Sequence, residues 1–338
     1  MSESIALSRR TILLMPLVAV ACRRGPDVLE LSGTTMGTSY SITAVDHDRR
    51  LDDRMLRASV ETALLKVNRH LSNWDGASEV SRFNAAATQQ PISASPVFTQ
   101  VMQAAEDVHL ASDGAFDITL GPVIETWGFG APVNGYARPS SDAILAALQD
   151  VGQDQLRITP TAITKSNPQT QVYLSGIGKG FGVDEVARAL AQAGVSDFMV
   201  EIGGDLFASG RNPDGLPWQI GIETPDPFDR TVQSVAEISG FGVATSGDYR
   251  NFFETDGIRY SHILDPRTGR PVTHSTASAT VLAETAMMAD AWSTAMLALG
   301  SAHGRELANQ HNIAVLFIDR EGHALRQHAS ARFRALQA

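Results

Sequence analysis

The stretch at residues 245–271 constrains the fold of this chain more than any other part of its sequence. It reads TSGDYRNFFETDGIRYSHILDPRTGRP, and the pair Asp256-Gly257 between the strand-like runs FFE and IRY predicts a β-hairpin. The second strand would carry His262 to a turn at residues 265–269, DPRTG. A hairpin tip that gathers His, Asp, Arg and hydroxyl groups is typical of a functional site.

Composition bounds the fold class and excludes some functions. The chain has 338 residues, 43% of them hydrophobic and 19% charged. It can therefore bury a large core, as one α+β unit or as two domains of about 150 residues. Its formal net charge of −10 argues against a nucleic-acid-binding protein, which would carry a basic surface. A ligand with phosphate groups would need local cations or a metal ion.

Residues 1–21 are predicted to be an export signal. Arg9 and Arg10 precede the uncharged, mostly apolar run 11–21, which is too short to span a bilayer because a spanning helix needs about 20 apolar residues. The segment SRRTILL resembles a twin-arginine signal, and the residues before Cys22 resemble a bacterial lipoprotein box. We expect lipidation of Cys22 in preference to an ordinary cleaved signal.

Cys22 is the only cysteine in the sequence, so the folded part is expected to use neither disulfides nor thiol chemistry. Residues 22–28 are expected to form a linker, and residues 29–338 a single domain. The protein would be exported to the periplasm, and a lipid on Cys22 would anchor it to the inner membrane.

Hydrophobic periodicity and turn residues predict the order of the helices and strands. Helices are expected at 52–71, 95–114, 141–151, 287–299 and 302–311; strands are expected within 29–45, around a glycine-bounded turn, and at 156–158, 161–165, 198–202, 218–223 and 314–319, the last closing the chain. Segment 114–130 is rich in Gly, Pro and aromatic residues, and is expected to be neither a clean helix nor a clean strand.

A glycine-rich turn leads from a strand into a helix in the segment QVYLSGIGKGFGVDEVARALAQA, which ends at residue 193. Free backbone N–H groups at the start of a helix suit phosphate. The Walker pattern is absent because Gly180, rather than Ser or Thr, follows Lys179. The turn predicts either a phosphate site or plain packing of strand against helix.

The apolar helix at 287–299 contains Asp290, Ser293 and Thr294. Asp290 and Thr294 lie one turn apart on a single face. A carboxylate in so apolar a helix must be paired or bind a metal ion, and Asp with hydroxyl groups suits Mg²⁺ rather than zinc. The alternative is structural: Asp290 caps the helix and Thr294 bonds to its own backbone.

Seven stretches, in this order, resemble the ApbE family of FAD:protein FMN transferases. They are GTTMGTSY, LSNWDGASEVSRFN, GAFDITLGPVIETWGFG, LSGIGKGFGVDEVA, VEIGGDLFASG, TSGDYRNFF with YSHILDPRTGRP, and ADAWSTAMLALG. Together they span residues 33–300, and the ordered set is far more specific than any one stretch.

The resemblance implies an α+β, ApbE-like mixed fold with FAD bound between two lobes. It also implies Mg²⁺-dependent transfer of the FMN half of FAD to a Thr or Ser hydroxyl of an acceptor protein, with release of AMP. The acceptor would be another protein, typically a membrane redox subunit. Many family members are periplasmic lipoproteins, which agrees with the predicted export signal.

The resemblance also assigns roles to individual residues. FAD contacts would come from Met36, Trp74, Ala115, Phe116, Asp117, Tyr173, Lys179 and Leu264. Metal ligands would be Asp290, Thr294, Ser293 and the Gly176 carbonyl. His262 matches the histidine that activates the acceptor hydroxyl, and Trp74 the residue that lies against the isoalloxazine ring. Tyr173 departs from the pattern because many members have an FAD-contacting Asp there.

Two other functions remain open at this point. The same scaffold could be a Mg²⁺-dependent FAD diphosphatase in which water replaces the acceptor hydroxyl, or a non-catalytic exported flavin-binding lipoprotein. An unrelated hydrolase is disfavoured because the sequence contains no G-x-S-x-G nucleophile motif. Arg267 is expected to hold the Asp265 turn rather than to act on the ligand.

Overall fold

The computed structural model describes residues 26–130, 136, 138–226, 231–322 and 324–338. The predicted export signal and Cys22 lie outside these residues. No helix within the described part of the chain is long and apolar enough to cross a membrane. The first strand, β1, begins at Asp27, so the folded domain starts two residues before the predicted boundary.

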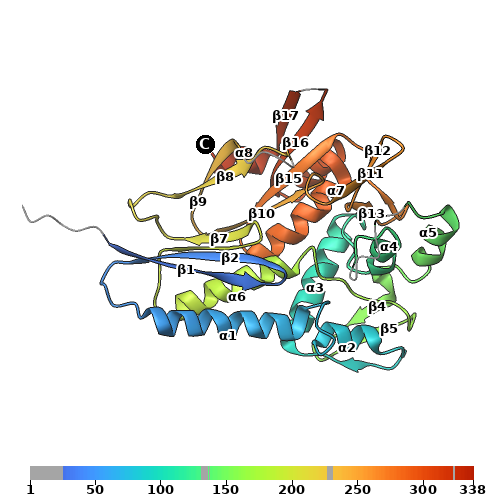
Figure 1. Cartoon of the computed structure of the whole chain (residues 1–338), viewed down its shortest axis with the longest axis horizontal. Helices are drawn as coiled ribbons and strands as arrows, with labels where there is room; N and C mark the ends of the chain where they lie inside the picture. The colour runs from blue at the N-terminus through green and yellow to red at the C-terminus, as the bar shows by residue number, and fades with distance from the viewer. Residues whose placement is uncertain (1–25, 131–135, 137, 227–230, 323) are drawn as a thin grey trace, which may run out of the picture.

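An antiparallel sheet of eight strands forms the larger of two lobes (Figure 1). In sheet order, the strands are β1 Asp27–Thr35, β2 Thr38–Asp46, β6 Phe198–Ile202, β7 Asp205–Ser209, β10 Phe241–Gly247, β15 Thr276–Ala283, β16 Ala314–Glu321 and β17 Ala324–Ala329. The predicted strands at 29–45, 198–202 and 314–319 are confirmed. The two residues between β1 and β2, Met36 and Gly37, have positive φ angles and form the predicted turn.

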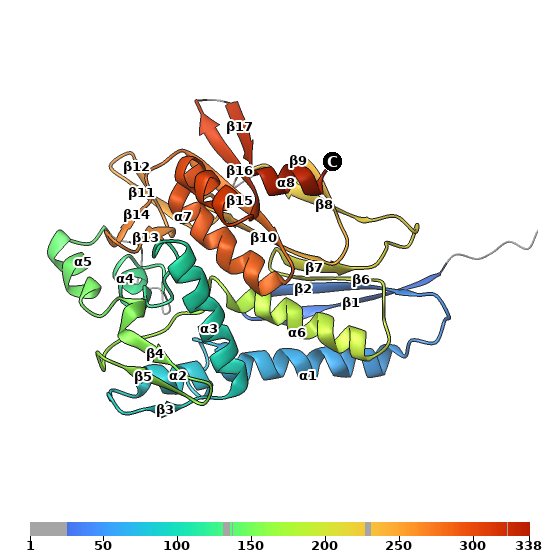
Figure 2. The same ribbon diagram turned by 180° about the vertical axis from the view of Figure 1, so that it is seen from behind.

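Three helices cover one face of the sheet: α1 Asp53–Leu71, α6 Gly178–Gln192 and α7 Ala286–Gln310. Figure 2 shows them together on this side, with α6 and α7 against the strands and α1 packed on α6. The helix predicted at 52–71 is confirmed as α1, and the structure adds that the Asp52 carboxylate caps its N-terminus. The predicted helices 287–299 and 302–311 are confirmed as the two parts of α7, which are separated by a kink at Gly300, where the backbone is not helical.

The opposite face is covered by the hairpin of β8 Trp218–Glu223 and β9 Val232–Ile238 and by α8 Ala331–Leu336. Their apolar side chains, including Ile220 and Phe333, share a buried cluster with the sheet. The prediction that strand 314–319 closes the chain is wrong, because β17 and α8 follow it. β17 is an edge strand that reads ALRQHA and has no buried residue, so it lacks the apolar pattern of a buried strand.

The second lobe contains short elements around α3. These are α2 Glu79–Ala85, α3 Pro96–Ala111, α4 Gly121–Thr126, α5 Ser141–Leu148, the 3₁₀ turn Gln153–Gln155, and a small sheet of β3 Ile92–Ser93, β5 Ala162–Lys165 and β4 Leu156–Ile158. Helix α3 packs against α7, and one apolar cluster joins the lobes. Segment 114–130 is irregular apart from α4, and the helix predicted at 141–151 ends at Leu148.

Two small hairpins confirm the prediction for residues 245–271. Strands β11 Phe252–Thr255 and β12 Ile258–Ser261 pair across Asp256 and Gly257, whose φ angles of 53° and 72° match a type I′ turn. Strands β13 Leu264–Asp265 and β14 Arg270–Pro271 pair immediately afterwards. In the second turn, the Arg267 guanidinium donates to the Asp265 carboxylate, as predicted.

Candidate active site

A cavity of about 790 Å³ lies where the large sheet meets α4, α6 and α7. This volume is within the range of sites for small molecules and cofactors. Most of the predicted site residues line it: Ala115, Phe116, Asp117, Tyr173, Gly176, Lys179, His262, Leu264, Asp290 and Thr294. The cavity thus brings together five segments that are separated in sequence: 115–118, 173–179, 243–251, 262–264 and 290–298.

Three ionisable side chains form a cluster at one side of the cavity. The Lys179 ammonium contacts the Asp205 carboxylate and lies 3.6 Å from Oδ1 of Asp290. Both aspartates are only 2% exposed. Burial alone would lower the pKa of Lys179, but the two carboxylates raise it above its ordinary value, so the lysine stays charged. Burial, and then the nearby Asp290, raise the pKa of Asp205.

The start of α6 is held directly against α7. The Gly180 N–H donates to Oδ2 of Asp290 at 3.1 Å. A Cβ at Gly180 would overlap the carbonyl group of Ala286, so only glycine permits this approach. This N–H group of the helix start therefore serves Asp290, and the glycine turn has a packing role whether or not it also binds phosphate.

Hydroxyl groups gather one turn along α7 from Asp290. The Ser246 Oγ lies 2.8 Å from Ser293 Oγ and 3.3 Å from Thr294 Oγ1. The backbone of Gly176 passes close to Thr294, since a Cβ at Gly176 would lie 3.0 Å from Thr294 Oγ1. One carboxylate, hydroxyl oxygens and a nearby backbone segment form a hard-oxygen donor set, which fits Mg²⁺. The described residues contain no group of three His, Cys, Asp or Glu able to hold a metal ion.

The structural alternative for Asp290 is wrong. Thr285 is the N-cap of α7 and accepts from the Met288 N–H. The Asp184 carboxylate of α6 accepts the N–H groups of Ala286 and Met287 at 2.8 and 2.9 Å. Other residues therefore cap α7. Asp290 belongs to the body of this helix, and its side chain lines the cavity.

His262 follows β12 and lines the same cavity. Its Nδ1 lies 3.0 Å from the Asn251 carbonyl oxygen, which can only accept, so Nδ1–H donates. In the neutral imidazole this leaves Nε2 with its lone pair free to take a proton. Burial lowers the pKa of His262 below its ordinary value, outweighing the Asn251 carbonyl, which favours the protonated ring. The ring is therefore neutral at pH 7.

Tyr173 lies against α4 at another part of the cavity wall. Its hydroxyl contacts Oε1 of Glu125, and its ring covers Gly121, where a Cβ would overlap ring carbons. Burial, followed by the Glu125 carboxylate, raises the pKa of Tyr173 above its ordinary value. The phenol remains protonated with its proton directed at Glu125, so its oxygen is available as an acceptor.

Two predicted FAD contacts are not brought to the cavity wall. Trp74 is 74% exposed and is not among the lining residues. Met36 packs on the core beside Gly178 and Gly182. Asp117 does line the cavity, but its carboxylate already accepts from Thr119 and from the Gln153 N–H.

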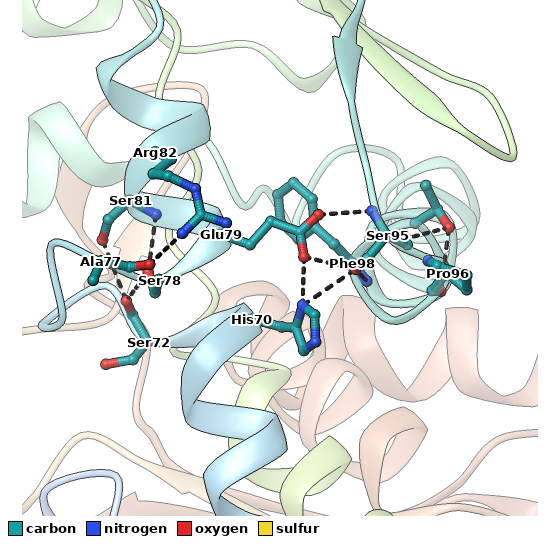
Figure 3. Close-up of polar contacts among 11 residues, drawn as sticks. His70, Ser72, Ala77, Ser78, Glu79, Ser81, Arg82, Ser95, Pro96 and Phe98 are labelled. Atoms are coloured by element: carbon teal, nitrogen blue, oxygen red, sulfur yellow. Dashed lines mark hydrogen bonds and ion pairs between the residues drawn. The ribbon is translucent and has the colours of Figure 1, made fainter.

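A network of polar contacts fixes the loop that carries Trp74 (Figure 3). Glu79 begins α2, and its carboxylate receives the Ser95 N–H at 2.7 Å, the Ser95 hydroxyl at 2.6 Å and His70 Nδ1 at 2.5 Å. One carboxylate thus ties the end of α1 to the starts of α2 and α3. At the other side of the loop, the hydroxyls of Ser78 and Ser81 donate to the Ser72 carbonyl.

Replacing Glu79 with Gln should lower the free energy of unfolding by about 1–3 kcal/mol, because hydrogen bonds to a charged, part-buried group are lost. Burial favours a higher pKa for Glu79, but hydrogen bonds from Ser95 and His70 lower it, so the carboxylate is charged in the native state. Urea denaturation would measure the change. The control Glu61→Gln removes a carboxylate on the exposed face of α1. A loss for Glu79→Gln no larger than for Glu61→Gln would contradict a stabilising network.

Asp205 was not predicted as a site residue, although it makes the closest contact with Lys179. It follows Gly203-Gly204 and begins β7, a strand with two buried residues next to one another at its start. A carboxylate at the head of a buried strand was the available signal, because such a charge needs a partner. Ser246 was also missed; its signal was weaker, since Ser is common in strands and loops.

Comparisons with known proteins agree with this arrangement. The ApbE family model matches residues 36–317. A FAD:protein FMN transferase from Vibrio cholerae is 37% identical over 318 residues, covering 94% of this chain and 95% of the relative. One from Escherichia coli K12 is 34% identical over 345 residues, covering 98% and 97%.

Solved structures give the same result. The flavinyl transferase ApbE of Pseudomonas stutzeri, in its apo form, superposes with a TM-score of 0.86 at 37% identity and covers 93% of this chain and 98% of that one. The flavin transferase ApbE from Vibrio cholerae gives a TM-score of 0.86 at 36% identity, covering 92% and 99%. The chain therefore belongs to the ApbE family.

Proposed function

We propose that this chain is a Mg²⁺-dependent FAD:protein FMN transferase that joins FMN to a Thr or Ser hydroxyl of an acceptor protein and releases AMP. The relatives named above are FAD:protein FMN transferases and cover nearly all of the chain. The observation that carries the proposal is the meeting of three kinds of group at one cavity: a cation, Lys179; a hard-oxygen set around Asp290; and a neutral imidazole, His262.

Asp290, Ser293, Thr294 and the Gly176 carbonyl would hold the magnesium ion. When bound, Mg²⁺ would neutralise charge on the diphosphate of FAD, which is what phosphoryl transfer chiefly requires. Lys179 adds a positive charge at the same wall. An acidic protein can thus bind a dinucleotide through one local cation and a metal ion.

His262 would act as the general base. Its Nε2 takes the proton of the acceptor hydroxyl as that oxygen attacks the phosphorus of the FMN half. The bond between this phosphorus and the bridging oxygen breaks, and the bridging oxygen leaves with AMP. The products are AMP and a phosphoester between FMN and the acceptor side chain, so no oxidant or reductant is consumed.

The cavity wall would contact FAD through Ala115, Phe116, Asp117, Leu264 and Tyr173. At Tyr173, the phenol oxygen would replace the usual Asp carboxylate as a hydrogen-bond acceptor, supported by Glu125. Trp74, on its exposed loop, would lie against the isoalloxazine ring, and Met36 would contact FAD nearby. For Trp74 and Met36 this requires a bound ligand that reaches beyond the present cavity wall.

With the predicted export signal and a lipid on Cys22, the proposed reaction would take place in the periplasm, and the enzyme would be anchored to the inner membrane. The acceptor would be a membrane redox subunit with a flavinylation-type Thr or Ser. Export of an enzyme that needs FAD also agrees with a twin-arginine signal, which exports folded proteins.

Incubation of the purified chain with FAD, MgCl₂ and a candidate acceptor domain tests the proposal. We expect AMP in equal amount to flavin that stays on the denatured acceptor, with FMN added to a Thr or Ser by mass spectrometry. Rapid AMP release without acceptor, and no protein-bound flavin, would indicate a diphosphatase instead. Tight FAD binding with no AMP under any condition would indicate a non-catalytic binding protein.

A further inference from the structure

Asp205 is a buried carboxylate in contact with the candidate site that does not line the cavity. It lies at the start of β7, and its Oδ2 receives the Lys179 ammonium. Lys179 does line the cavity and is 30% exposed. Asp205 can therefore act on a bound ligand only through its neighbours in this cluster, Lys179 and Asp290.

Both oxygens of Asp290 have partners within the chain. Oδ2 accepts the Gly180 N–H at 3.1 Å, and Oδ1 lies 3.6 Å from Lys179 Nζ. A metal ion at Asp290 would compete with the ammonium for Oδ1, because two cations repel at such distances in a buried site. The ammonium then needs another anion, since an unpaired buried charge is costly.

We propose that Lys179 is the internal counter-ion of Asp290 and that Mg²⁺ displaces its ammonium from that carboxylate. Asp205 is then the positioning residue that keeps the displaced ammonium beside the cavity. This inference rests on the metal site of the proposed function. The Lys179–Asp205 pair is the tighter of the two ion pairs, so the ammonium can leave Asp290 while keeping its main partner. Lys179 then remains available to substrate phosphate.

Titration of the full chain with MgCl₂, followed by calorimetry, tests the inference in Asp205→Asn, Lys179→Met and the double variant. Asp205→Asn should weaken Mg²⁺ binding about tenfold, because Lys179 then has Asp290 as its remaining carboxylate partner in this cluster. Lys179→Met should strengthen binding several-fold by removing the competitor. The double variant should bind like Lys179→Met, because Asp205 acts through the lysine.

The double variant distinguishes an effect of Asp205 that acts through Lys179 from a general effect of its charge on Mg²⁺ binding. An equal loss from Asp205→Asn in both backgrounds would mean that the carboxylate attracts Mg²⁺ through space, and would overturn the inference. No loss from Asp205→Asn would overturn it too. Glu201→Gln is the matched control: this carboxylate also lines the cavity, contacts the Gly204 N–H, and should change binding equally in both backgrounds.

Thermal unfolding gives a second readout that does not depend on transfer activity. Without Mg²⁺, Lys179→Met leaves two buried carboxylates with no ammonium between them, so its Tm should fall and MgCl₂ should raise it more than in the wild type. An equal rise in both proteins would contradict the inference. If the wild type binds no Mg²⁺, with or without FAD, or if Asp290→Asn binds Mg²⁺ as well as the wild type does, the metal assignment is wrong. The inference then fails with it.

Discussion

Asp290→Asn should lower kcat/KM for flavin transfer about 1000-fold, which corresponds to a loss of ~4 kcal/mol of transition-state stabilisation. Asp290 is the only carboxylate in the proposed donor set, and the hydroxyls of Ser293 and Thr294 are weak metal ligands without it. Asparagine has nearly the same shape and can still accept the Gly180 N–H, so the loss should come from charge. Flavin transfer at varied MgCl₂ would measure the effect.

The fold should survive this change. Lys179 keeps Asp205 as its partner, and the capping of α7 by Thr285 and Asp184 does not involve position 290. Glu284→Gln is the matched control, since it removes an exposed carboxylate just before α7 and should leave kcat/KM unchanged. Transfer by folded Asp290→Asn at a rate close to the wild type would remove Asp290 from the metal site.

Local sequence rules predicted much of the fold. The periodic helix α1, the start of helix α3 at Ser95-Pro96, and the hairpin at Asp256-Gly257 all depend on residues close in sequence. Strand β15 was missed because it reads TASATVLA and is buried over nearly its whole length. Its first six residues alternate between Thr or Ser and an apolar residue, but both sets are buried, and its place between β10 and β16 depends on distant partners.

In the candidate site too, features set by residues close in sequence could be predicted, whereas contacts that depend on tertiary packing could not. The position of Asp290 and Thr294 on one face of the helix could be predicted, because helix geometry alone places residues four apart on the same face. The contact between Lys179 and Asp205 spans 26 residues and depends on the packing of α6 against β7, which no local pattern encodes. The family resemblance supplied His262, but the structure adds its tautomer through the Asn251 carbonyl.

His262→Ala should lower kcat for flavin transfer by about 100- to 10,000-fold, the range of general acid–base catalysis. Its Nε2 is the proposed proton acceptor, while its Nδ1 is committed to Asn251. KM for FAD should change little, since the imidazole acts on the acceptor hydroxyl and not on FAD binding. His303→Ala, on the exposed surface of α7, is the control and should retain full activity. Partial recovery by added imidazole would support a proton-transfer role.

The dependence of kcat/KM on pH provides an independent check on His262. Burial lowers its pKa below the ordinary value of 6.5, so the base stays neutral as the pH falls through 6.5 and becomes protonated only at lower pH. Activity should therefore persist at pH 6.5 and decline on an acidic limb centred below it. The residual activity of His262→Ala should lack that limb. An acidic limb centred above pH 6.5, or one that survives in His262→Ala, would assign the base to another group, because protonation of His262 would then not control the rate.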